Sequence, residues 1–239
     1  AERIVAMGAQ AERVAVTGNL KFDMQVQPVD SAERERLRTA FHLPSATVIW
    51  VAGSTHAGEE EILTAVYRDL VASGESLFLI LVPRHPERCR AVREMFVGQG
   101  FDVDLRSALA ERSADFCPGE ILLVDTLGEM LTFYALADLV FVGGSLVPVG
   151  GHNVLEAALR EKPVVFGGYM HNFKEISSLL LNEGAGLMVN DRLELLGAIR
   201  QLLADAPRRA AMGRAGAALL ERNAGATDKT VAVIDRLVR

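Results

Sequence analysis

Short apolar runs alternate with longer amphipathic stretches along most of the chain. We expect strands near Val14–Val16, Val48–Ala52, Leu77–Val82, Phe101–Asp104, Ile121–Val124, Leu139–Val142, Val164–Phe166 and Gly186–Val189. We expect helices near Ala32–Phe41, Glu59–Ala72, Pro86–Val97, Gly128–Ala135, Asn153–Arg160, Asn172–Asn182, Arg192–Ala204, Pro207–Arg222 and Thr227–Leu237. Continuously apolar strands separated by helices indicate a parallel sheet that is covered on both faces. The pattern therefore predicts an α/β fold with a doubly wound, mainly parallel, Rossmann-like sheet.

Composition narrows the class of protein. The 239 residues, 50% of them hydrophobic, suffice for one large or two small domains. A net charge of -6 with 6% aromatic residues argues against nucleic acid as the main partner. Cys89 and Cys117 lack the spacing of a zinc site or a redox pair. The longest apolar run, Leu77–Val82, is too short to span a bilayer.

The stretch from Leu139 to Glu156 carries the clearest chemistry. A predicted strand leads through a glycine-rich turn, Gly143–Gly151, into a predicted helix that begins at Asn153. Such a turn leaves backbone N–H groups and a positive helix end facing one place, which suits a phosphate. Glu156 lies one turn inside that helix, where its carboxylate can accept hydrogen bonds from ribose hydroxyls. The two features suggest a nucleotide site; an ordinary α/β turn with a solvated glutamate is the alternative.

Polar residues also follow most of the other predicted strands. These segments are Thr17–Asp23, Gly53–Glu60, Pro83–Arg88, Asp125–Met130 and Gly167–Asn172. In an open parallel sheet, ligands bind outside the carboxyl ends of the strands, so these segments belong to one binding edge. The segments that enter strands, such as 73–76 and 160–162, have the composition of plain solvated loops. We therefore expect one edge of the sheet to be the site.

Several residues of this edge have two interpretations. Arg84 is fixed between Pro83 and Pro86, so its guanidinium is placed to hold a phosphate or a base edge. Ser54 or Thr55 either contacts the ligand or caps the next helix. Gly128, Glu129 and Met130 open a helix, and alone they suit a simple turn as well as a site. Lys21 would not be singled out without the other loops.

No metal site is predicted from the residue spacings. Asp102 and Asp104 form an Asp-x-Asp pair, a pattern associated with metal-bound nucleotide sugars in some transferases. Both side chains would share one face of a peripheral strand, and we interpret them as solvated. The Gly143–Gly151 turn lacks the dinucleotide fingerprint, which argues against hydride chemistry.

Five motifs taken together carry a family resemblance. They are Thr17-Gly18-Asn19-Leu20-Lys21-Phe22-Asp23, Gly53-Ser54-Thr55-His56, Pro83-Arg84-His85-Pro86-Glu87-Arg88, Asp125-Thr126-x-Gly128-Glu129, and Gly143-Gly144-Ser145 with Gly150-Gly151-His152-Asn153-x-Leu155-Glu156. In this order and spacing they resemble the 3-deoxy-D-manno-oct-2-ulosonic acid (Kdo) transferases of lipopolysaccharide biosynthesis. The resemblance covers nearly the whole chain, but only the C-terminal half of such an enzyme.

The resemblance implies an architecture. Family members are inverting, B-type glycosyltransferases with two Rossmann-like domains, of which the first holds the lipid A precursor (lipid IVA) and the second holds CMP-Kdo. Residues 1–239 would be the second domain alone, a fragment that begins within a helix-like segment, Ala1–Met7. Residues 1–13 would be an interdomain helix or linker, and residues 226–237 a helix that packs toward the missing domain. The parent enzyme would associate with the cytoplasmic face of the bacterial inner membrane, whereas the fragment would be soluble.

The resemblance also implies roles for single residues. The CMP moiety would be contacted by Pro83, Arg84, Gly128, Glu129, Met130, Asn153, Val154, Leu155 and Glu156. Lys21 matches the family lysine that stabilises the transition state, in which negative charge accumulates on the departing phosphate. No metal or other cofactor is implied. The general base belongs to the missing domain, so the fragment alone is expected to bind CMP or CMP-Kdo weakly and to transfer nothing.

Two other interpretations remain open at this stage. The chain could be the nucleotide-binding domain of another B-type transferase or epimerase that uses a UDP-sugar. It could also be a non-catalytic nucleotide-binding or interaction module that is complete in itself.

Overall fold

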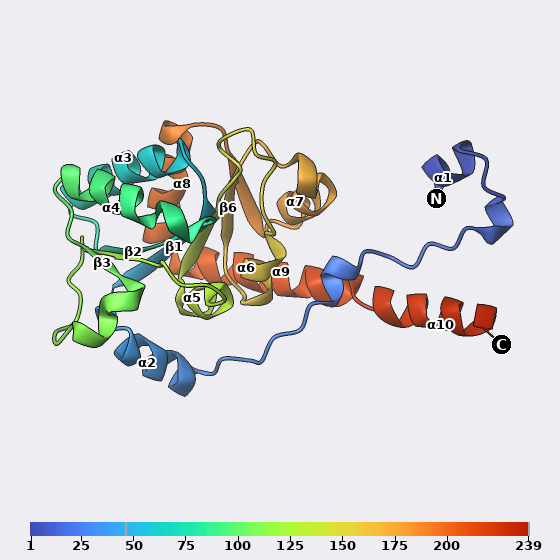
Figure 1. Ribbon diagram of the computed structural model, residues 1–239, viewed down its shortest axis with the longest axis horizontal. Helices are drawn as coiled ribbons and strands as arrows, with labels where there is room; N and C mark the ends of the chain where they lie inside the picture. The colour runs from blue at the N-terminus through green and yellow to red at the C-terminus, as the bar shows by residue number, and fades with distance from the viewer. Residues whose placement is uncertain (46, 239) are drawn as a thin grey trace.

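A computed structural model describes residues 1–45 and 47–238 of the chain. Seven strands form a single, wholly parallel sheet in the order β3-β4-β2-β1-β5-β6-β7 (Figure 1). The strands are β1 (Val48–Thr55), β2 (Leu77–Pro83), β3 (Val103–Leu105), β4 (Ile121–Leu123), β5 (Leu139–Val142), β6 (Val164–Gly167) and β7 (Gly186–Val189). The strand order reverses direction on either side of β1, which confirms the predicted doubly wound fold.

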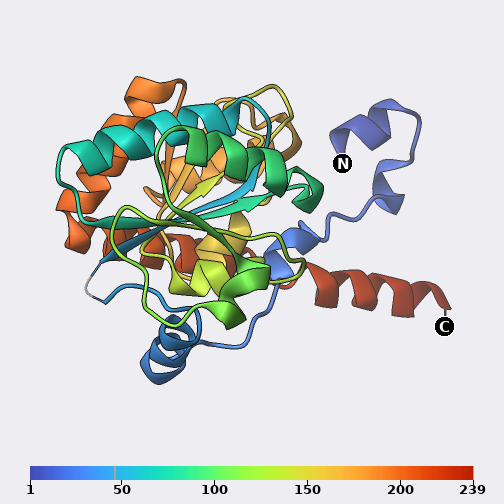
Figure 2. The ribbon, with the colours of Figure 1, turned by 60° about the vertical axis from the view of Figure 1, so that its left-hand side comes forward.

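Helices cover both faces of this sheet (Figure 2). The α-helices are α1 (Glu2–Ala6), α2 (Ser31–Ala40), α3 (Glu59–Ala72), α4 (Cys89–Gly98), α5 (Met130–Leu136), α6 (Leu155–Leu159), α7 (Lys174–Asn182), α8 (Arg192–Ala204), α9 (Ala206–Asn223) and α10 (Ala226–Val238). Short 3-10 turns are η1 (Ala11–Arg13), η2 (Leu20–Asp23), η3 (Pro86–Arg88), η4 (Arg106–Glu111) and η5 (His171–Phe173). Helices α3, α4 and α8 pack on one face, and α5, α6, α7 and α9 pack on the other.

The strands are continuously apolar because each contributes to two cores. In β1, Ile49 and Val51 face the core beneath α5 and α6, whereas Trp50 and Ala52 face the core beneath α3 and α8. All four side chains are fully buried. Side chains of a strand alternate between the two faces of its sheet, so a sheet covered on both faces requires apolar residues at every position.

One predicted strand is wrong. Val14–Val16 lies outside the sheet in an extended segment, where the side chain of Val16 is 74% exposed. The three residues have the right composition for a strand, but none of the described strands pairs with them. The solvated loop expected at 160–162 is also partly wrong, because Lys162 is partly buried and the other two residues border a cavity.

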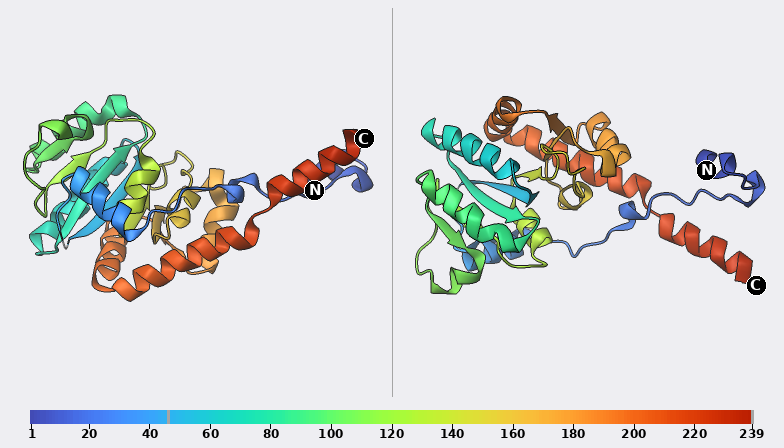
Figure 3. Two further views of the ribbon diagram at one scale, coloured as in Figure 1. Left: turned by 90° about the horizontal axis from the view of Figure 1, so that it is seen from below. Right: turned by 45° about the horizontal axis from the view of Figure 1, so that its top comes forward.

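The first residues of the chain and α10 project beyond the sheet on the same side of the molecule (Figure 3). They meet at η2, where the Asp23 carboxylate accepts hydrogen bonds from the N–H groups of Gly225, Ala226 and Thr227. The side chain of Thr227 also bonds to Asp23, and it is the largest cause of a lowered pKa. Together with the N–H groups it lowers the pKa of Asp23 to about 2. Asp23 therefore fixes η2 against the start of α10, and the assignment of residues 1–13 and 226–237 to an interdomain contact stays a prediction.

Candidate functional site

A cleft of about 340 Å³ opens at the carboxyl ends of the strands. Its walls come from the segments that follow β1, β2, β4 and β5, together with η5 after β6. Seven of the nine predicted nucleotide contacts line it: Pro83, Arg84, Gly128, Glu129, Met130, Asn153 and Glu156. These residues are separated by up to 73 positions in the chain, yet the fold brings them around one space of nucleotide size.

The other two predicted contacts lie behind the cleft wall. Val154 and Leu155 are fully buried in the core on the α6 side of the sheet. Their side chains therefore cannot touch a ligand in the cleft, and any contact from them is limited to their backbone. Helix α6 begins at Leu155 rather than at the predicted Asn153, because the Asn153 side chain accepts a hydrogen bond from the Leu155 N–H at 3.2 Å.

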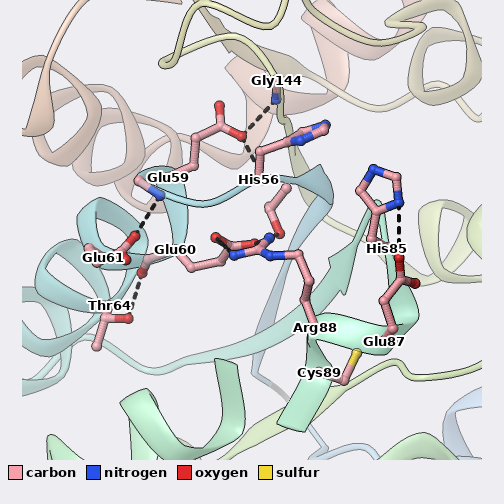
Figure 4. Close-up of polar contacts among 12 residues, drawn as sticks. His56, Glu59, Glu60, Glu61, Thr64, His85, Glu87, Arg88, Cys89 and Gly144 are labelled. Carbon is pink, nitrogen blue, oxygen red and sulfur yellow. Dashed lines mark hydrogen bonds and ion pairs between the residues drawn. The ribbon is translucent and has the colours of Figure 1, made fainter. Parts of the chain in front are cut away.

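The glycine-rich turn after β5 does not offer all its N–H groups to a ligand. The carboxylate of Glu59, at the start of α3, accepts hydrogen bonds from the N–H groups of Gly144 at 2.7 Å, Ser145 at 2.9 Å and Leu146 at 2.9 Å. A fourth bond comes from the N–H of His56 at 3.0 Å (Figure 4). Burial raises the pKa of Glu59, and these four donors act against the rise. The expectation that this part of the turn binds a phosphate is wrong, because a buried carboxylate of the protein occupies it.

Glycines bring the strand ends close enough for this arrangement. A Cβ atom at Gly143 would lie 2.5 Å from the carbonyl oxygen of Ser54, and one at Gly53 would lie 2.3 Å from the hydroxyl of Tyr134. Ser54 itself has a φ of 56° and lines the cleft. The close approach of β1 and β5 therefore requires glycine at position 143, and the packing of Tyr134 of α5 against β1 requires it at position 53.

Neither Ser54 nor Thr55 caps α3. The N-cap residue is Gly58, whose N–H donates to the side chain of Glu61 at 2.8 Å. Thr55 is fully buried and donates to Glu60, which also receives both guanidinium nitrogens of Arg88 at 2.8 and 3.1 Å. This partly buried ion pair joins the first turn of α3 to η3 after β2, and so it fixes the turn that carries Arg84.

Glu129 and Glu156 have different surroundings in the cleft. Glu129 accepts from Arg106 at 2.8 Å and from the hydroxyl of Thr126, so its carboxylate already has two protein partners. Glu156 accepts a single side-chain bond, from Asn153 at 3.2 Å, and burial raises its pKa. Glu156 therefore has the free acceptor capacity that ribose hydroxyls need, whereas Glu129 orders the loop before α5. Sequence reasoning missed Arg106, which follows the edge strand β3.

Three histidines gather at the edge of the cleft. His56 and His152 stack with ring planes 4° apart, and their Nε2 atoms lie 2.7 Å apart. His85 meets His56 edge-on, with 5.7 Å between ring centroids. Burial first, then the neighbouring imidazoles and Arg84, lowers the pKa of His152 to about 4. His56 and His152 belong to two of the sequence motifs but had no predicted role, although β1 and β5 are neighbours in the sheet and each is followed by one of them.

Lys21 does not line the cleft. It lies on η2 beside a neighbouring cavity of about 580 Å³, which it shares with Asn19, His171 and Lys174. Its ammonium nitrogen lies 4.0 Å from the ring centroid of Phe173, and Phe173 lines both cavities. A single aromatic ring therefore separates Lys21 from the nucleotide-sized cleft.

The Asp-x-Asp pair does not line the cleft; it borders a different cavity. Asp104 is on the edge strand β3 and pairs with Arg112, which also binds Glu120. Among residues 1–45 and 47–238, no group of three or more His, Cys, Asp or Glu side chains is arranged to hold a metal ion. Within the same ranges, none of the helices has the length and apolar character needed to cross a bilayer.

The fold and the position of the cleft define the class of protein. A seven-stranded parallel sheet with helices on both faces and a nucleotide-sized cleft at its carboxyl edge is the arrangement of a Rossmann-like nucleotide-binding domain. No protein-family model matches the chain.

Known proteins identify the family. The chain is 35% identical to the 3-deoxy-D-manno-octulosonic acid transferase of Haemophilus influenzae, over 95% of its own length and 52% of that protein. It is 35% identical to the transferase of the same name from Bordetella pertussis, over 98% and 53%. Its fold matches the crystal structure of the C-terminal CMP-Kdo binding domain of WaaA from Acinetobacter baumannii, with a TM-score of 0.71, 30% identity, and coverage of 79% of this chain and 96% of that domain. The chain belongs to the Kdo transferase family, and it spans about half the length of the curated relatives it matches.

Proposed function

We propose that this chain is the donor-binding domain of an inverting glycosyltransferase that moves Kdo from CMP-Kdo to a lipid A precursor. The observation that carries the proposal is the single cleft lined by Arg84, Glu129, Asn153 and Glu156. The matched domain from Acinetobacter baumannii is named as a CMP-Kdo binding domain, and it shares the fold of this chain.

Each wall of the cleft suits one part of CMP. Glu156, with free acceptor capacity beside Asn153, would take the ribose hydroxyls. Arg84 is exposed on a turn held by two prolines, and its guanidinium would take the phosphate. Because Glu59 already accepts hydrogen bonds from the N–H groups of the turn after β5, the phosphate would be recognised mainly by cationic side chains such as Arg84. No metal is needed for this arrangement.

Lys21 suits the sugar side of the donor. Its ammonium group lies across Phe173 from the CMP cleft, so the bond between phosphate and Kdo would lie near that ring. A cation in that position would stabilise the charge that develops on the departing CMP phosphate. The general base would come from the half of the relatives that this chain does not span. The complete enzyme would work at the cytoplasmic face of the bacterial inner membrane in lipopolysaccharide biosynthesis, and this chain alone would be soluble and would transfer nothing.

Calorimetric titration of the chain with CMP, UMP and UDP tests the proposal. We expect CMP to bind best, and Arg84→Gln to weaken CMP binding by about tenfold because one charge-assisted contact to phosphate is lost. Arg90→Gln is the matched control, since Arg90 is 91% exposed on the following helix and pairs with Glu94. A preference for UDP would indicate a UDP-sugar enzyme. Equal binding by both arginine variants would contradict the placement of the phosphate.

A further inference from the structure

Another cavity, of about 540 Å³, lies toward the amino ends of the strands. We call it the α6–α9 cavity. Residues 160–162 border it where they connect α6 to the amino end of β6, whereas the nucleotide cleft lies at the carboxyl ends of the strands. It is lined by Val26, Pro28, Val29, Arg34, Ala135, Leu159, Arg160, Glu161, Lys162, Ala210 and Arg214. Arg160 donates a hydrogen bond to the carbonyl of Gln27 at 2.6 Å, and so it links the segment before α2 to the end of α6.

The lining of the α6–α9 cavity is strongly cationic. Arg34, Arg160, Lys162 and Arg214 border it, and Glu161 is the one acidic residue in the lining. Asp138 lies nearby, but its carboxylate is shared between Arg34 at 2.9 Å and the N–H of Ile49 at 2.8 Å. The chain as a whole carries a net charge of -6, so this concentration of positive charge is contrary to its average.

Two of these cations have donor atoms that the described residues leave without a partner, although the guanidinium of Arg34 also pairs with Asp138. Lys162 is partly buried, and within residues 1–45 and 47–238 its ammonium group has no ion pair and no side-chain hydrogen bond. The Nε atom of Arg34 is buried and also has no hydrogen-bond partner in that part of the chain. Burying a charge is costly unless it is paired, so a protein keeps such groups where an anion completes them.

We propose that the α6–α9 cavity binds a phosphate-bearing ligand, with the phosphate held by Lys162, Arg34 and Arg214. A phosphate offers several acceptor oxygens and up to two negative charges, which matches one ammonium and two guanidinium groups in the lining of one cavity. Val26, Pro28 and Val29 form an apolar wall beside the cations, which suits carbon attached to the phosphate rather than the bare ion. The ligand is therefore a phosphate ester, either a soluble phosphorylated compound or a phosphate lipid headgroup. This site is separate from the nucleotide cleft, and it does not depend on what the cleft binds.

Calorimetric titration with glycerol 3-phosphate tests the site in the full chain. The test variant combines Lys162→Met with Arg214→Gln. The control combines Arg90→Gln with Lys229→Gln, which removes the same charge from exposed positions elsewhere. We expect binding at least about tenfold weaker in the test variant and unchanged in the control, because two charge-assisted contacts are lost. Equal affinity of glycerol 3-phosphate for the two variants overturns the proposal.

A second measurement does not depend on the stability of the test variant. In the unaltered chain, glycerol 3-phosphate is expected to shift the amide resonances of Glu161 and Lys162, and Lys162→Arg is expected to retain the binding. Shifts confined to the nucleotide cleft would overturn the proposal.

Phosphatidylcholine vesicles with and without phosphatidic acid identify the source of the phosphate. Co-sedimentation that requires phosphatidic acid and is lost in the test variant assigns a lipid headgroup. Binding of glycerol 3-phosphate alone assigns a soluble ester. Absence of both overturns the site.

Discussion

The replacement of Glu59 by glutamine tests how the site is built. The carboxylate is fully buried, and each of its oxygens accepts two N–H groups: Oε1 from Ser145 and Leu146, Oε2 from His56 and Gly144. Glutamine keeps the size of the side chain but can offer only one acceptor oxygen. Its amide NH2 would face two N–H donors, so Glu59→Gln leaves two buried donors without a partner.

The structure allows the size of this effect to be worked out. A hydrogen bond to a charged group contributes about 1.5–3 kcal/mol, so two lost bonds cost about 3–6 kcal/mol. Removing a buried charge recovers part of that cost, and we expect a loss of about 3 kcal/mol in the free energy of unfolding. The loop from Gly144 to Asn153 loses its anchor as well, so CMP binding is expected to weaken by about tenfold.

Urea unfolding and CMP titration measure both effects. Glu61→Gln is the matched control on the same helix, because exposed Glu61 accepts one N–H, that of Gly58, and the glutamine oxygen can replace it. We expect the control to change stability by less than about 0.5 kcal/mol. If Glu59→Gln were no more destabilising than Glu61→Gln, the reasoning that a buried carboxylate holds the turn would be refuted.

Three further predictions concern other titratable groups. Asp23→Ala is expected to lower the thermal midpoint and to weaken donor binding, because η2 loses its bonds to α10 and Lys21 loses its support; unchanged melting would refute this. The folded-state pKa of His152 is lowered from 6.5 to about 4, so its contribution to stability is present above pH 6.5 and is lost toward pH 4. Unfolding measured across that range should therefore show a smaller acid loss in His152→Gln, and equal slopes would contradict the assignment. Burial and the nearby Arg34 lower the pKa of Lys162 from 10.5 to about 8. The free energy of unfolding relative to that of Lys162→Met should therefore rise by up to about 3 kcal/mol between pH 8 and 10.5. A difference that does not change with pH would exclude the shift.

Much of the fold follows from local sequence. Seven of the predicted strands are present because their apolar runs are flanked by helices that cover both faces, as β1 and β2 show. The predicted Val14–Val16 strand has the same residue types, and it fails because strand formation requires a neighbouring strand, which three residues of sequence do not reveal. The edge of the sheet that carries the cleft could also be predicted, because the carboxyl ends of parallel strands lie on one side of the sheet.

The partners of single side chains could not be predicted in the same way. Arg106 reaches Glu129 across 23 positions, and Arg88 reaches Glu60 across 28. Nothing in the residue types distinguishes these arginines from the exposed Arg90. Lys162 is the opposite case: the two residues before it are charged, as in a solvated loop, but its side chain is partly buried and lines a cavity with Val26.

The turn after β5 shows why a glycine-rich sequence alone does not define a phosphate site. Backbone N–H groups that converge at the end of a parallel strand attract any anion, and that anion can be a side chain of the protein. Here the competing anion comes from α3, the helix that follows the neighbouring strand β1, and it reaches the turn because β1 and β5 are adjacent. A glutamate in the first turn of the helix that follows the neighbouring strand is therefore the sequence feature that decides whether the turn binds a side chain of the protein or a ligand. With Glu59 in place, the turn is rigid before a ligand arrives, and recognition passes to Arg84, Asn153 and Glu156 around it.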